Sequence, residues 1–201
     1  MIHFIRIPKN ASRSIKSTNL FTCSNHIPVT QLSEKFKDTW RTDIKFCVTR
    51  NPYDRLVSAY CNGIEFCEKQ QRPYFPQFKN FTSFEEFCLD ANNLFFFGEV
   101  RPAGKRSVRV VHPHFRTQCY WVKNKDDKLD INFMMRFETL ERDWITFLDH
   151  YKIPWTSLPQ RNSSEHERWK NYYTKRIADV VYSIYEEDFR RLGYSRDSWE
   201  K

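Results

Sequence analysis

The alternation of apolar and polar residues along the chain predicts short buried strands, each followed by an amphipathic helix. Two apolar runs, residues 2–7 and 43–50, have the length and composition of buried strands. A helix is expected to begin near Ala11 to Ser14 after the first run, and at Pro52 after the second. Proline suits the first turn of a helix because the amide hydrogen that it lacks would have no intrahelical partner there.

The C-terminal half has a clearer helical period. Residues 138–151 and 174–194 are both typical of amphipathic helices, and Gly193 stands where a helix C-terminal cap belongs. Seven apolar positions recur every three or four residues in the second segment: Ile177, Val180, Val181, Ile184, Tyr185, Phe189 and Leu192. This segment is the most strongly predicted helix of the chain.

The segments between these elements give weaker signals. Ser83 and Glu86 form a capping-box pattern that predicts a short helix. The apolar stretches "QCYWV" (118–122) and "INFMMRF" (131–137) are typical of strands joined by a turn. Loops are expected over 69–82 and over most of 98–114, where glycine and proline recur among basic residues, and residues 153–173 show no regular period.

Strands that alternate with helices predict an α/β fold with a mainly parallel central sheet. The chain has 201 residues, of which 40% are hydrophobic and 17% aromatic, so it can bury a core rather than stay disordered. This length favours one domain, residues 1–201.

The formal net charge of +8 is compatible with nucleic acid, an acidic glycan, an anionic membrane surface or a phosphorylated cofactor, and does not choose among them. No apolar run reaches the ~18 residues of a membrane-spanning helix, and the first residues lack the pattern of a signal peptide. The six cysteines form no C-x-x-C pair, which predicts reduced thiols and no zinc site. One N-glycosylation sequon lies at Asn10, inside the candidate site described next, which favours a bacterial or host cytoplasm.

The stretch "IPKNASRSI" (7–15) has the features of a phosphate-binding turn. It connects a strand to a helix start, whose unpaired amide N–H groups and positive dipole favour an anion. Lys9 adds a charge, and Ser12 and Ser14 add short hydroxyl groups. The order of residues differs from the G-x-x-x-x-G-K-[ST] pattern of ordinary ATP and GTP sites.

A second strand end, "TRNPYDRLVSAY" (49–60), strengthens this interpretation. Arg50 ends the strand, and Ser58 follows eight residues later, about two helical turns away. Both can then face one phosphate group at the carboxyl edge of the sheet, where ligands of open α/β folds bind. Two such strand ends predict a ligand with two separated phosphate groups.

These two stretches resemble the cofactor motifs of sulfotransferases that use 3′-phosphoadenosine-5′-phosphosulfate (PAPS). "PKNASRS" (8–14) is similar to their 5′-phosphosulfate loop, and "TRNPYDRLVSAY" to their 3′-phosphate motif, with Arg50 and Ser58 in the matching places. The resemblance is to the carbohydrate sulfotransferase branch, including its small soluble bacterial and viral members. It continues in the same order through "HFRTQCYWV", "FMMRFETLERDWITFL" and "YYTKRIADVVYSIYEEDFRRLGY".

The resemblance implies a P-loop-like three-layer sandwich that binds PAPS without a metal and releases the 3′,5′-bisphosphate PAP. The residues expected at the cofactor are Lys9, Asn10, Ala11, Ser12, Arg13, Ser14, Arg50 and Ser58. Ala11 stands where many relatives have glycine and fits a tight turn if its φ stays negative, and Arg13 stands where a small residue is common. Lys9 is expected to stabilise the leaving phosphate oxygen.

A general base must accept the proton of the acceptor hydroxyl, and histidine suits this role because its ordinary pKa is ~6.5. His114 is the first choice because it begins the family-like "HFRTQ" segment, and His112 is the second. Glu65 and Glu99 remain alternatives, since carboxylates serve as the base in some sulfotransferases.

The expected acceptor is a hydroxyl of a carbohydrate or a related molecule. The basic stretch 101–116 would suit an anionic one. Two other functions stay open at this point: a P-loop-like kinase or NTPase, and a non-catalytic basic module that binds nucleic acid or acidic glycan. The first is disfavoured by the missing G-K-[ST] pattern, and the second does not need Arg50 and Ser58 at their spacing.

Overall fold

The computed structural model describes residues 1–23, 25–70, 81–90, 97–100, 108–159 and 167–200. Contacts between residues divide the chain into two compact units, each made of two chain segments. Unit 1 comprises residues 1–51 and 117–163, and unit 2 comprises residues 52–116 and 164–201. The single domain expected from the length stays a prediction.

Unit 1 is built on a four-stranded sheet in which every pair of neighbouring strands is parallel. The strand order is β2-β1-β3-β6, with β1 (Ile2–Ile5) and β3 (Ile44–Thr49) at the centre. Strands β2 (Thr22–Cys23) and β6 (Phe133–Arg136) form the edges. The predicted α/β class with a parallel sheet is therefore confirmed.

Alternate residues of the strands face two separate cores, as the period of a strand requires. Phe4 and Phe46 contribute to one core with Trp144 and Phe147, whereas the neighbouring residue Cys47 contributes to the other. Phe4 and Phe46 stack with ring centroids 5.0 Å apart. Because both faces are buried, the strands carry continuous apolar runs rather than alternating ones.

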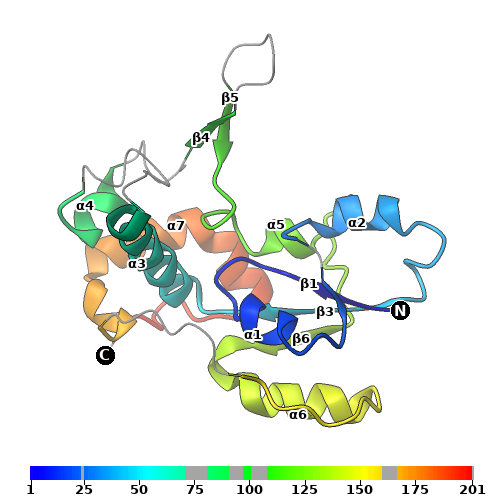
Figure 1. The fold of residues 1–201 in the computed structure, drawn as a ribbon. Helices are drawn as coiled ribbons and strands as arrows, with labels where there is room; N and C mark the ends of the chain where they lie inside the picture. The colour runs from blue at the N-terminus through cyan, green and yellow to red at the C-terminus, as the bar shows by residue number, and fades with distance from the viewer. Residues whose placement is uncertain (24, 71–80, 91–96, 101–107, 160–166, 201) are drawn as a thin grey trace. The chain divides into compact units, whose positions relative to one another are not determined.

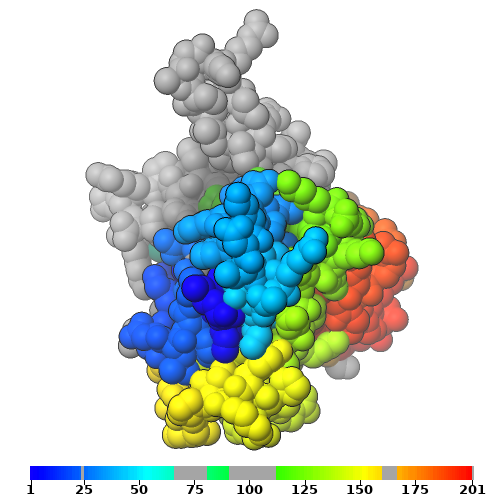
Figure 2. All heavy atoms as spheres, turned by 90° about the vertical axis from the view of Figure 1, so that its right-hand side faces the viewer, coloured from blue at the N-terminus to red at the C-terminus, as the bar shows by residue number. Residues whose placement is uncertain are grey.

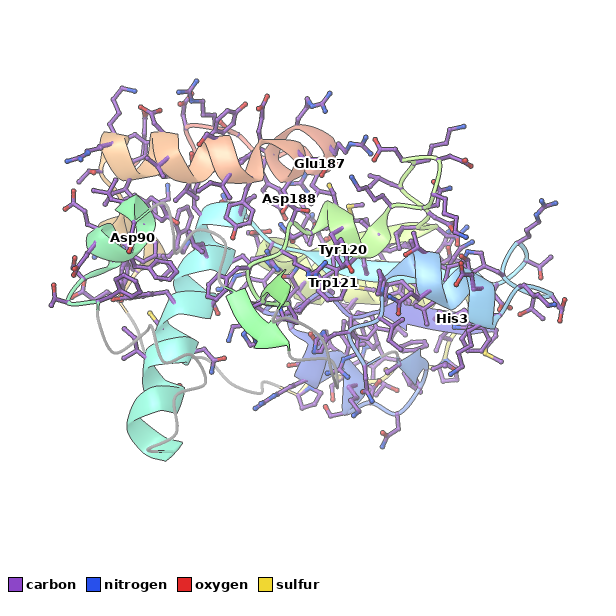
Figure 3. The ribbon with its side chains drawn as sticks, turned by 90° about the horizontal axis from the view of Figure 1, so that it is seen from above. His3, Asp90, Tyr120, Trp121, Glu187 and Asp188 are labelled. Carbon is purple, nitrogen blue, oxygen red and sulfur yellow. The ribbon has the colours of Figure 1, made fainter. Side chains whose placement is uncertain are left out.

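Helices cover each face of this sheet (Figure 1). On one side lie α1 (Ser12–Lys16) and α6 (Leu140–His150), and on the other lie α2 (Val29–Lys35) and α5 (Cys119–Val122). Seen from above, Trp121 lies on α5 and is 2% exposed (Figure 3). The predicted three-layer sandwich with a central parallel sheet is confirmed for unit 1.

Buried polar groups gather at the amino ends of the strands, the edge of the sheet opposite to the predicted site. The Asp43 carboxylate accepts hydrogen bonds from the Met1 amine (2.7 Å), from His3 Nε2 (2.8 Å) and from Thr39 Oγ1 (2.7 Å). These bonds hold the pKa of Asp43 well below its ordinary value. Figure 2 shows this edge, with the first residues beside the segment that leads into β3 and above α6.

Unit 2 is mainly helical and has its own aromatic core. Helix α3 (Pro52–Gln70) begins at Pro52 as predicted, and it contacts α7 (Lys175–Leu192) and the 3-10 helix Trp169–Tyr172. Helix α4 (Phe84–Leu89) also packs on α7. The buried members of this core include Tyr53, Val57, Phe87, Phe115, Val181, Tyr185 and Phe189.

The predicted capping box at the start of α4 is confirmed in its first half. The Ser83 side chain accepts a hydrogen bond from the Glu86 amide, as an N-cap should. The Glu86 carboxylate turns instead to the amide and hydroxyl of Thr82, both at 2.8 Å. The helix start is therefore closed one residue earlier than the ordinary pattern.

Two local predictions are wrong. The segment "QCYWV" forms helix α5 and not a strand, since the Thr117 hydroxyl accepts from the Tyr120 amide and starts a turn there. Part of 98–114 is also not a loop, because β4 (Phe97–Val100) pairs with β5 (Val108–Val111) in an antiparallel hairpin. The valines at the ends of this segment outweighed its glycine and proline residues. The predicted loop at 69–82 lies mostly outside the described residues.

The C-terminal cap of α7 permits a direct test of local conformation. Gly193 has φ 68° and ψ 40°, and the next amide, Tyr194 N, donates to the Phe189 carbonyl at 3.0 Å. We expect Gly193→Ala to lower the free energy of unfolding by about 1 kcal/mol in a denaturant titration, because a Cβ is disfavoured at this φ. Gly193→Asn should cost less, since asparagine tolerates this conformation. Equal stability of all three proteins would contradict the cap.

Candidate active site

The loop after β1 has a backbone conformation that its sequence does not predict. Lys9 has φ 70° and Ala11 has φ 52°, both in the left-handed region that glycine prefers. The condition under which an alanine was expected to fit this turn, a negative φ at Ala11, is therefore not met. Each such residue costs roughly 1–2 kcal/mol, so the surrounding contacts must hold the loop in this form.

The serines of this loop face inward and stabilise it. Ser12 begins α1, is buried, and its hydroxyl donates a hydrogen bond to the Ile7 carbonyl at 3.0 Å, which ties the helix start to the strand end. Ser14 is also buried, and its carbonyl accepts a hydrogen bond from the Ser17 hydroxyl at 2.7 Å. Arg13 is exposed on the other side of this short helix. The predicted hydroxyl donor of Ser12 is thus used within the loop itself.

Arg50 lies next to this loop, as the two-motif prediction requires. Its guanidinium donates a hydrogen bond from Nη1 to the Lys9 carbonyl at 3.1 Å and lies 4.0 Å from the ring centre of Phe137. The residue is 8% exposed, so its charge is largely shielded from water. Two strand ends, β1 and β3, therefore bring Lys9 and Arg50 together in unit 1.

Two buried amides that the sequence analysis gave no structural role hold these strand ends in place. Gln118, which is 0% exposed, accepts a hydrogen bond from the Arg50 amide at 2.9 Å and donates one to the Arg50 carbonyl at 2.8 Å. Asn10, which is 1% exposed, donates from Nδ2 to Gln118 Oε1 at 2.7 Å and to the Val48 carbonyl at 2.8 Å. The sequon at Asn10 is therefore buried in the fold.

Another residue that the sequence analysis did not single out is Glu138, directly after Phe137. Its carboxylate accepts a hydrogen bond from the Asn51 amide at 2.6 Å. The segment between β6 and α6 thus contacts the end of β3 twice, once through a ring and once through a carboxylate. The motif "FET" lies within the family-like segment, but no local pattern indicates this contact.

Ser58 and His114, the other predicted site residues, belong to unit 2. Ser58 lies on α3 and is 4% exposed. That it shares a phosphate group with Arg50 stays a prediction. Glu65 also lies on α3, and Glu99 lies on β4 opposite Arg109.

The turn that carries His114 is well supported inside unit 2. The carbonyl of Phe115 accepts a hydrogen bond from Tyr185 Oη at 2.9 Å, and the carbonyl of Arg116 accepts one from Arg55 Nη1 at 2.9 Å. Helices α3 and α7 therefore both hold the residues that follow His114. A fixed backbone at this point suits a side chain that must meet a reacting atom.

His112 and His114 differ in what their rings can do. The backbone amide of His114 donates to Nδ1 of His112 at 3.2 Å, so the neutral His112 ring carries its proton on Nε2. Burial lowers the pKa of His112 to about 4, which keeps this ring neutral above pH ~5. His112 therefore acts as a hydrogen-bond acceptor for the backbone, and its remaining nitrogen is a donor rather than a base.

Strand ends bring Lys9, Asn10 and Arg50 together at the carboxyl edge of a parallel sheet, the place where open α/β proteins bind their ligands. The chain belongs to the sulfotransferase family: the model of that family matches residues 1–195. The resemblance to sulfotransferases is therefore confirmed at the level of the family, and the chain is a transferase of sulfuryl groups. No curated protein and no solved structure matches the chain.

Three further observations concern the parts of the chain that the structure describes. None of the helices there is long and apolar enough to cross a bilayer. No three histidine, cysteine, aspartate or glutamate side chains gather there as a metal ion would require. The side chains of Cys23, Cys47, Cys61, Cys88 and Cys119 are thiols and not disulfides.

Proposed function

We propose that this sulfotransferase takes the sulfuryl group from PAPS and transfers it to a hydroxyl of a carbohydrate or a related acceptor. An acceptor that carries an anionic group would suit the positive net charge of the chain. The observation that carries the proposal is the contact of Arg50 with the Lys9 loop across two strand ends. A bisphosphate nucleotide needs positive charge at both of its phosphate groups. The Lys9 loop after β1 and Arg50 after β3 supply this charge from the ends of two separate strands.

The residues present fit a PAPS-like ligand. Lys9 and Arg50 contribute two cations, and the loop between Lys9 and Ser12 turns its backbone at two residues of positive φ. Alternating backbone conformations of this kind direct successive amide N–H groups to one side, an arrangement typical of anion sites. Ser58 on α3 is proposed as a further donor to the 3′-phosphate.

In this proposal each residue has a distinct task. PAPS supplies an activated sulfuryl group attached to a phosphate that can leave. Lys9 stabilises the negative charge that develops on the leaving oxygen, and Arg50 holds the 3′-phosphate. His114 accepts the proton of the attacking hydroxyl, since an imidazole changes protonation near neutral pH.

The choice of nucleotide gives the most direct test of the proposal. We expect calorimetry to show tight binding of PAP and much weaker binding of ATP, because ATP lacks the 3′-phosphate that Arg50 and Ser58 would hold. A tighter complex with ATP would favour the kinase alternative. Binding of heparin or nucleic acid without either nucleotide would favour a basic binding module.

The contribution of Arg50 can be measured in the same assay. Arg50→Ala should weaken PAP binding by roughly tenfold or more, since a charge-assisted hydrogen bond contributes about 1.5–3 kcal/mol. Lys125→Ala is a suitable control, because it removes the same charge from an exposed pair with Glu34 in unit 1. If both variants bind PAP equally, the effect comes from net charge and Arg50 does not belong to the site.

A further inference from the structure

Gln118 is a buried amide that connects the two stretches of the proposed phosphate site. Its Oε1 accepts hydrogen bonds from the Arg50 amide and from Asn10 Nδ2, and its Nε2 donates to the Arg50 carbonyl. One side chain therefore satisfies both backbone groups of Arg50, as the backbone of a neighbouring strand would. It also reaches the loop after β1 through Asn10.

The hydrogen-bond network permits one orientation of both amides. If Gln118 were turned over, its NH₂ group would face two donors, the Arg50 amide and Asn10 Nδ2. If Asn10 were turned over, its oxygen would face the Val48 carbonyl and Gln118 Oε1. The network is thus specific in direction, which is the property expected of groups that fix a geometry.

The position of Arg50 in the sheet explains why it needs such support. The register of β3 with β6 ends at Thr49, which is paired with Arg136, and the register of β3 with β1 ends at Cys47. Arg50 thus lies one residue beyond the paired part of its strand. Gln118 holds its backbone there, while Phe137 and the Lys9 carbonyl hold its guanidinium.

We propose that Gln118 is a positioning residue for the nucleotide: it holds Arg50 and the Lys9 loop as one rigid unit that receives the phosphate groups of PAPS. The inference rests on the proposed function, since it concerns the same site. Gln118 itself need not touch the nucleotide, and it acts through Arg50 and Asn10. Its loss should therefore remove most of the benefit that Arg50 gives to binding.

A thermodynamic cycle with PAP as the ligand tests this coupling. Gln118→Met keeps the length of the side chain and removes its donors and acceptors. We expect Arg50→Ala to weaken PAP binding roughly tenfold in the native protein but less than about twofold in the Gln118→Met protein, because coupled residues give non-additive effects. A residue that only stabilised the fold would leave the effect of Arg50→Ala unchanged.

A second variant gives a result even if Gln118→Met does not fold. In Gln118→Glu, a protonated carboxyl group offers one donor and one acceptor in the places of the amide, and an ionised one offers none of the donors. The quantity to measure is the ratio of the PAP affinity of this variant to that of the native protein at the same pH. This ratio should be near one at low pH and should fall at least about fivefold as the carboxyl group ionises. Burial should place this transition above the ordinary pKa of ~4.3.

Asn132→Ala provides the matched control. The Asn132 side chain accepts a hydrogen bond from the Lys45 amide at 2.8 Å, a similar contact at the opposite end of β3. This variant should lower the melting temperature and leave PAP affinity unchanged. Additive effects in the cycle, or a ratio for Gln118→Glu that does not change with pH, would overturn the inference alone. Failure of the native protein to bind PAP would overturn the proposed function and this inference together.

Discussion

Lys9→Ala is expected to lower kcat by about 10²–10³ while it weakens PAP binding much less. The reason is that the ammonium group matters most where negative charge develops on the leaving oxygen, and interactions made only in the transition state appear in kcat. Steady-state kinetics with varied PAPS, together with calorimetry of PAP, separates the two effects. A variant with normal kcat and a raised KM for PAPS would make Lys9 a simple binding residue.

The backbone at Lys9 makes a matched control necessary. Lys9 has a positive φ, and its carbonyl accepts the hydrogen bond from Arg50, so a substitution could disturb the loop as well as remove a charge. Lys9→Arg keeps the charge and the backbone requirement, and it should keep PAP affinity while losing part of kcat. Lys16→Ala removes an exposed lysine from α1, the short helix that follows this loop, and should leave both values unchanged. These variants together distinguish the effect of the Lys9 ammonium group from an effect of the protein's net charge.

The sequence predicted the framework of the candidate site because that framework is local. The apolar runs that become β1 and β3 end at the loop and at Arg50, and Pro52 marks the start of α3. Each of these signals depends on neighbouring residues and on the periods of strands and helices. The contact of Arg50 with the Lys9 carbonyl then follows from the parallel pairing of the two strands.

The supporting residues could not be predicted because their partners are distant in sequence. Gln118 meets Arg50 and Asn10 across 68 and 108 positions, and no periodic pattern records such a contact. The positive φ of Ala11 was missed for a related reason: the chain holds a non-glycine residue in a conformation that tertiary contacts impose. The helix at 119–122 likewise places Trp121 in a core against its strand-like composition.

His114→Ala should leave PAP binding nearly intact and cut turnover by about 10²–10⁴, the usual contribution of a general base. The native rate should rise with pH through a group near neutrality, since an imidazole accepts a proton only when it is neutral. Loss of His114 should remove this rise. A pH–rate profile of both proteins, measured with an acceptor that the native enzyme turns over well, tests the assignment.

His112 supplies the control for this experiment, because its ring has a different role. Its pKa is lowered to about 4, so ionisation of His112 would affect the rate only below pH ~5 and cannot account for a change near neutrality. His112→Asn keeps an acceptor near the His114 amide and should retain most of the activity, with the pH profile unchanged above pH ~5. If His112→Asn is the inactive variant, His112 is the base and the assignment of the two histidines is reversed.

If neither substitution matters, a carboxylate such as Glu65 or Glu99 must take the proton. The rate would then already be maximal at a lower pH, because a carboxylate ionises below neutrality unless burial raises its pKa.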